Sequence, residues 1–126
     1  MSSKRLKVLL IGASGTIGVA VKENLSQRHD VITAGTKTGD IQLDVTDPES
    51  IRRAFEQLSP LDAVVTTLGK ATFAPFEELE AAPLESTRHR LGIENKLLGQ
   101  VNVAQCARDH LVDGGSITLT SGIVNE

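Results

Sequence analysis

The chain has few aromatic residues, a single cysteine and no long apolar run. Its 126 residues include three Phe and neither Trp nor Tyr, so we expect a core of Val, Ile, Leu and Ala. One cysteine, Cys106, excludes a disulfide within the chain, which is compatible with a reducing compartment. No apolar segment approaches the roughly 20 residues that a membrane helix needs, so we expect no membrane partner.

Neither sign of charge dominates the sequence. The net charge is −3 and the basic residues are scattered, which gives no track for a nucleic-acid backbone. Lys4 and Arg5 are followed by a glycine-rich stretch rather than a secretory core, so a cytoplasmic location is expected. The sequence has 40% hydrophobic and 23% charged residues and no repeat or linker, which indicates one globular domain over residues 1–126.

Short apolar segments alternate with amphipathic ones along the chain. Apolar segments on both faces of each strand, joined by long crossovers, are typical of a parallel sheet covered by helices on both sides. We therefore predict a doubly wound α/β fold with the element order β-α-β-β-α-β-α-β. The predicted strands are 6–11, 30–35, 41–45, 61–69 and 116–121. The predicted helices are 15–28, 48–58, a short one between Pro75 and Pro83, and 88–112, stopped by Gly114–Gly115.

Two of these helices have a clear apolar stripe. The residues expected to face the core are Ile17, Ala20, Val21 and Leu25 in the first helix, and Ile51, Ala54, Phe55 and Leu58 in the second. The second also has a strong start signal, because Asp47 can cap the helix and Pro48 suits its first position.

Three glycines follow the first predicted strand at intervals of three. Gly12 would permit a tight turn, Gly15 would let a pyrophosphate approach the main chain, and Gly18 would let the helix pack on the sheet. The helix N-terminus then offers free N–H groups to phosphates, with hydroxyl donors from Ser14 and Thr16. The alternative is that the glycines serve only the turn and the packing.

With these features the sequence resembles the short-chain dehydrogenase/reductase family. "GASGTIG" is similar to that family's glycine-rich segment, and "LDVTD" to the segment whose aspartate lies near the adenine ring. "DAVVTTLGKATFAPFEEL" resembles the fourth strand and the segment after it, and "GGSITLTSG" the fifth strand. The resemblance implies a Rossmann-type sheet of order 3-2-1-4-5. It also implies a dinucleotide held by Gly12, Ser14, Gly15, Thr16, Ile17, Gly18, Thr36, Lys37, Asp44, Val45, Leu68 and Gly69.

The sequence also departs from that family. The usual Asn-Asn-Ala-Gly motif reads Thr-Thr-Leu-Gly at 66–69. The family's Asn three residues before a helix glycine aligns with Lys96, with Asn95 one position earlier, and its serine aligns with Ser121 or Gly122. The family's Tyr-x-x-x-Lys pair lies beyond the fifth strand and is absent from this chain. Lys96 and Ser121 remain the candidate catalytic residues, against the alternatives of a solvated lysine and a simple strand-end hydroxyl.

The end of the second predicted strand bears on the choice of cofactor. NAD-selective enzymes usually have a carboxylate there, whereas this chain has Thr36 and Lys37, and Asp40 lies too far on. We therefore expect NADP in preference to NAD, although Lys37 could be an ordinary loop lysine.

Three functions remain open. The first is an NAD(P)-dependent oxidoreductase acting on a carbonyl or alcohol substrate. The others are an inactive NADP-binding module and an incomplete fragment of a longer reductase, so whether the chain is an enzyme stays undecided. An exposed fifth strand favours a homo-oligomer. His29, His89 and His110 share no ligand spacing, so no metal is expected.

Overall fold

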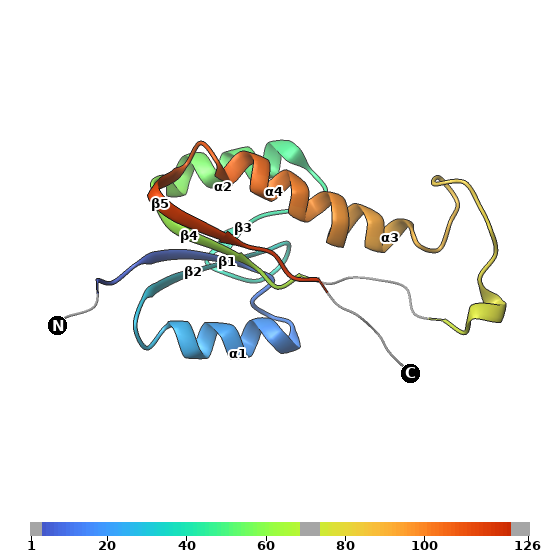
Figure 1. The fold of residues 1–126 in the computed structure, drawn as a ribbon, viewed down its shortest axis with the longest axis horizontal. Helices are drawn as coiled ribbons and strands as arrows, with labels where there is room; N and C mark the ends of the chain where they lie inside the picture. The colour runs from blue at the N-terminus through green and yellow to red at the C-terminus, as the bar shows by residue number, and fades with distance from the viewer. Residues whose placement is uncertain (1–3, 69–73, 122–126) are drawn as a thin grey trace.

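The computed structural model describes residues 4–68 and 74–121, which form a parallel sheet covered by helices (Figure 1). The strand order within this part of the chain is β3-β2-β1-β4-β5, as the family resemblance implied. Each neighbouring pair is parallel. The strands are β1 (Lys7–Ile11), β2 (Asp30–Gly35), β3 (Ile41–Gln42), β4 (Leu61–Thr66) and β5 (Leu111–Thr118).

The helices divide unequally between the two faces of the sheet. In Figure 1, α2 (Pro48–Leu58) and a continuous helical run lie on one face, and α1 (Thr16–Leu25) lies on the other. The run consists of α3 (Arg90–Gly92), the π-helix η2 (Ile93–Gly99) and α4 (Gln100–Ala107). A short 3₁₀-helix, η1 (Phe76–Glu78), lies in the segment between Pro75 and Pro83, where a short helix was predicted.

The main core lies between the sheet and α2 with α4. Ile51, Ala54 and Phe55 on α2 are at most 2% exposed, which confirms most of the predicted stripe, and Leu58 packs at its edge. Apolar side chains from the centre of the sheet, such as Leu9 and Val64, are fully buried beneath them.

The predicted stripe on α1 is wrong in part. Ile17 and Ala20 are exposed, whereas Val21 and Leu25 are half-buried. All residues of α1 are described, and only Gly18 among them is buried. The helix therefore meets the sheet mainly through its glycine-bearing first turn. It ends at Leu25, and residues 26–28 form a turn rather than continuing the helix.

The predicted helix over 88–112 is too long at its C-terminal end. Helix α4 ends at Ala107, and Leu111 already pairs with Leu61 as part of β5. The next matched pair is Ala63 with Ser116, so β5 bulges between these points, with Gly114 at φ +80°. The two glycines thus accommodate a bulge inside a strand and do not stop a helix.

The third strand is also shorter than predicted. It covers Ile41–Gln42 rather than 41–45, because its partner β2 ends at Gly35. Leu43 and Val45 are nevertheless buried. They leave the sheet edge and become part of a cavity wall.

Candidate functional site

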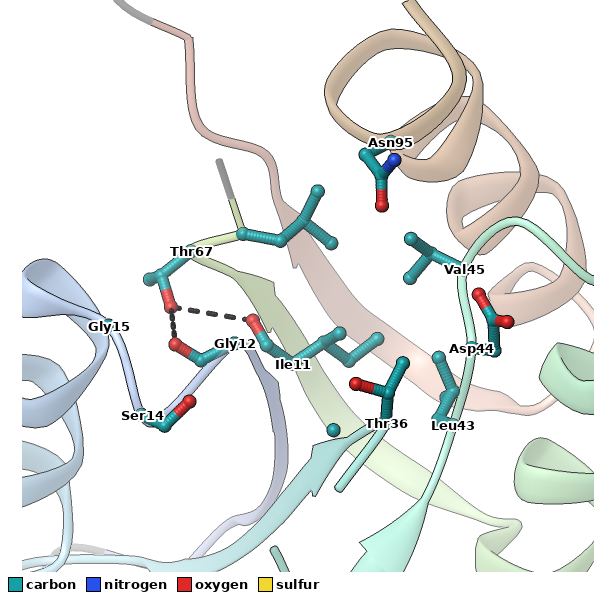
Figure 2. A pocket seen from close by; sticks show the side chains of 12 residues that line it. Ile11, Gly12, Ser14, Gly15, Thr36, Leu43, Asp44, Val45, Thr67 and Asn95 are labelled. Carbon is teal, nitrogen blue, oxygen red and sulfur yellow. Dashed lines mark hydrogen bonds between the residues drawn. The ribbon is translucent and has the colours of Figure 1, made fainter. Parts of the chain in front are cut away.

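A cavity of about 280 Å³ opens at the carboxyl ends of β1, β2 and β4 (Figure 2). In open parallel sheets this is where ligands bind. Its lining mixes small, apolar and polar residues from loops far apart in the sequence. The described residues that line it are Ile11, Gly12, Ser14, Gly15, Gly35, Thr36, Leu43, Asp44, Val45, Thr67, Leu68 and Asn95.

The turn between β1 and α1 requires two of its glycines. Gly12 has φ +94°, a conformation that side chains disfavour. A Cβ on Gly18 would lie 2.0 Å from the carbonyl oxygen of Gly12, so any side chain would push the helix off the turn. Thr67 fixes the turn, because its Oγ1 donates to the Gly12 carbonyl oxygen at 2.9 Å (Figure 2).

Gly15 is different, because the described protein does not itself require a glycine there. Its φ is −79°, and the nearest described atom to an added Cβ is 3.7 Å away. The position lines the cavity at the N-terminus of α1, where a missing side chain leaves space for a ligand to approach the backbone. This geometry fits the phosphates of a dinucleotide.

The N-terminus of α1 is electrostatically suited to an anion. No described side chain caps this helix, and its first turn carries no acidic residue. The first N–H groups of a helix lack intrahelical acceptors and carry the positive end of its dipole. This end of the cavity can therefore hold negative charge.

The opposite end of the cavity has apolar walls with polar groups between them. Leu43, Val45 and Leu68 supply the apolar surface. Asp44 is held in place, because its Oδ1 accepts bonds from the Thr46 N–H at 2.9 Å and from the Thr46 hydroxyl at 2.7 Å. Such a lining suits a flat, mostly apolar group with polar edges.

The end of β2 presents a threonine to the cavity rather than a carboxylate. Thr36 lines it, whereas the Asp40 carboxylate accepts bonds from the Thr33 N–H and hydroxyl. Bonding from the Thr33 backbone, then from its side chain, lowers the pKa of Asp40 below its usual value. Asp40 is therefore engaged within its own loop. Lys37 lines an adjoining cavity with Arg53.

The predicted cofactor residues come together in large part. Described residues that line the cavity include Gly12, Ser14, Gly15, Thr36, Asp44, Val45 and Leu68. Thr16 and Ile17 lie in the adjoining first turn, Gly18 lies beneath the glycine turn, and Lys37 lies in the neighbouring cavity. Gly69 is outside the described residues.

The two predicted catalytic residues are not among the described residues that line this cavity. Ser121 lies three residues beyond the end of β5, and Lys96 lies in η2. Between them sits a buried polar connection centred on Gln100. Its Nε2 donates to the carbonyl oxygens of Lys96 and Thr120, each at 2.8 Å, and its Oε1 accepts from the Thr120 N–H at 2.8 Å.

The Thr66 hydroxyl also donates to Gln100 Oε1, and the Thr120 hydroxyl donates to the Thr66 carbonyl. Gln100 thus fixes the helix to the ends of β4 and β5 and orients the segment that leads to Ser121. Gln100 and Thr67 were not predicted as site residues from the sequence, and Asn95 was noted only as the position before Lys96. The sequence signal for Gln100 was its position directly after Gly99, where a polar residue follows a glycine within the predicted helix.

Comparisons with known proteins agree with this geometry. The model of the NAD dependent epimerase/dehydratase family matches residues 8–121. The crystal structure of the protein lin1944 from Listeria innocua is 45% identical, with a TM-score of 0.82. That match covers 93% of this chain and 56% of the lin1944 chain. No curated protein matches the chain.

A small-chain dehydrogenase in complex with NADPH is 28% identical, with a TM-score of 0.77, covering 94% of this chain and 52% of that one. A short-chain dehydrogenase/reductase from Serratia marcescens shares the fold at 24% identity and a TM-score of 0.69. That match covers 89% of this chain and 55% of the Serratia chain. The chain thus spans little more than half the length of these proteins.

No helix in the described part of the chain is long and apolar enough to cross a membrane. The predicted likeness to short-chain dehydrogenases is confirmed by the family match and by the solved structures. The chain belongs to the NAD dependent epimerase/dehydratase family.

Proposed function

We propose that the chain binds NADP(H) in the cavity of Figure 2 and forms the cofactor-binding part of a short-chain oxidoreductase. One observation carries the proposal: the uncapped N-terminus of α1 opens into the cavity beside Gly15, where the described protein leaves room for a phosphate. The bound nicotinamide would supply hydride transfer to or from a carbonyl or alcohol carbon.

The preference for NADP rests on the end of β2. A carboxylate near this position would bind the ribose hydroxyls of NAD and repel a 2′-phosphate. Asp40, the nearest carboxylate along the loop, is engaged with Thr33 instead. Thr36 and Lys37 supply a hydroxyl and a positive charge for the 2′-phosphate.

Catalysis is proposed for Ser121 and Lys96, which Gln100 links through the backbone of Lys96 and Thr120. Ser121 would donate a hydrogen bond to the substrate oxygen at the carboxyl edge of the sheet. Because the chain spans about half of its solved relatives, the reaction and substrate of the whole protein belong to this proposal. A homo-oligomeric state and a cytoplasmic location are also part of this proposal.

The test is a titration of the folded chain with NADPH and with NADH, followed by nicotinamide fluorescence. We expect tighter binding of NADPH, and loss of that preference in Lys37→Glu, which reverses the charge near the 2′-phosphate. Arg28→Glu, on the turn after α1, is the matched control for a charge reversal elsewhere. Equal binding of both nucleotides by the unaltered chain would contradict the NADP assignment.

A further inference from the structure

A π-helical segment of the long helix carries an asparagine that lines the cavity of Figure 2. By the family resemblance, the residue three positions before Gly99 is a candidate catalytic residue, and in this chain it is Lys96. The structure has a π-helix over Ile93–Gly99, and Asn95, rather than Lys96, is among the described residues that line the cavity. π-Helical turns are rare and occur frequently at functional sites.

The Asn95 side chain is held in one orientation. Its Nδ2 donates to the carbonyl oxygen of Leu91 at 3.0 Å, and only the amide nitrogen can make that bond. The amide oxygen is therefore the group left to face the cavity. Figure 2 shows it directed towards the pocket, above Val45 and Ile11.

The helix that carries Asn95 is itself fixed to the site. An added Cβ on Gly99 would lie 2.8 Å from Val45 Cγ2, so the helix backbone packs directly on the cavity wall. Gln100, the next residue, is 6% exposed and bonds to Thr120, two residues beyond the end of β5. An oxygen held by such a helix is a preorganised acceptor.

Asn95 lies far from the phosphate end of the cavity. The glycine turn and α1 form one side in Figure 2, and Asn95, Val45 and Asp44 form the other. If the pyrophosphate binds at Gly15, the group reaching Asn95 is the base of the adenosine half. Val45 and Leu68 supply apolar surface for the faces of its ring, and Asn95 lies where a polar edge would pass.

Resting on the proposed function, we propose that Asn95 selects the base, its Oδ1 accepting a hydrogen bond from the exocyclic amine of adenine. Amide side chains recognise the adenine edge in this way in nucleic-acid complexes. Hypoxanthine has a carbonyl oxygen in place of that amine, so two acceptors would face each other. Asn95 is then a specificity-determining residue that neither the glycine motif nor the strand ends reveal.

The test compares NADPH with its deamino analogue, which carries hypoxanthine in place of adenine. Both are titrated into the unaltered chain, Asn95→Leu and Asn95→Ala, with thermal unfolding to verify each fold. We expect the unaltered chain to prefer NADPH by about tenfold, the value of one well-made hydrogen bond. In the variants NADPH binding weakens, binding of the analogue changes little, and the ratio of the two affinities falls.

Asn102→Leu is the matched control, because Asn102 lies on α4 and lines a separate groove with Pro48 and Gln105. It should keep the preference for NADPH. An unchanged ratio in both Asn95 variants, or no preference in the unaltered chain, would overturn the assignment of Asn95 alone. Failure of the folded chain to bind either dinucleotide would overturn the proposed function as well.

Discussion

Helices α1 and α2 begin in opposite ways. At α2, the Asp47 side chain accepts a bond from the Glu49 N–H at 3.0 Å, and Pro48 and Glu49 complete the first turn. At α1, the N-cap is Gly15, no described side chain caps the helix, and its first turn has no acidic residue. One N-terminus is neutralised by the protein, and the other is left open at a cavity.

The same two helices differ in what they bury. Helix α2 packs Ile51 and Phe55 into the main core, both at 0% exposure, whereas Gly18 is the only buried residue among those of α1. The two helices therefore have different roles. Helix α2 stabilises the sheet, and α1 contributes a turn and an open N-terminus suited to an anion.

Truncating the core face of α2 should destabilise the protein most. Phe55→Ala removes a fully buried ring that stacks on His110 with centroids 5.8 Å apart. We expect the free energy of unfolding to fall by about 3–5 kcal/mol, as for other buried Phe truncations. Urea denaturation would measure it, and a loss below about 1 kcal/mol would show that α2 does not hold the core.

A smaller effect is expected at the α2 cap. Asp47→Ala removes the acceptor for the Glu49 N–H and should lower the free energy of unfolding by about 1 kcal/mol. NADPH affinity should not fall, because this N-terminus is not the one at the proposed phosphate site. Asp47→Asn, which keeps an acceptor, is the control. Loss of NADPH binding in Asp47→Ala would erase the distinction between the helices.

The smallest effect is expected on the exposed face of α1. Ile17 is 55% exposed, so Ile17→Ala should change the free energy of unfolding by no more than about 0.5 kcal/mol. Its backbone N–H is retained, so NADPH affinity should also be retained. A loss as large as that of Phe55→Ala would show that α1 buries this side chain in solution.

The α2 side of the molecule was readable from sequence for a physical reason. Asp47, Pro48 and the stripe ending at Leu58 are local signals, since a cap and a 3.6-residue period depend only on neighbours along the chain. The apolar segments predicted a parallel sheet, and the strand order followed from the family resemblance. The cavity residues on the glycine turn were found because that motif is also local.

Other features depend on contacts between distant segments. The exposure of Ile17 reflects how little covers α1 in the described structure, which a helical period cannot reveal. Gly114–Gly115 predicted a helix stop, but pairing with β4 makes them part of a bulge. Asn95 lines the cavity because its helix packs beside Val45 from a distant loop, which no local pattern reports.

If the open N-terminus of α1 holds the pyrophosphate, an acidic N-cap at this helix must repel the cofactor. The most direct measurement is a side-by-side NADPH titration and urea denaturation of the unaltered chain and Gly15→Asp. The substitution gives α1 an acidic N-cap like that of α2, at a position with room for a Cβ and an extended backbone. We predict unchanged or slightly higher stability, by a few tenths of a kcal/mol, together with at least a tenfold loss of NADPH affinity. Undiminished NADPH binding by a folded Gly15→Asp chain would show that the N-terminus of α1 does not hold the pyrophosphate.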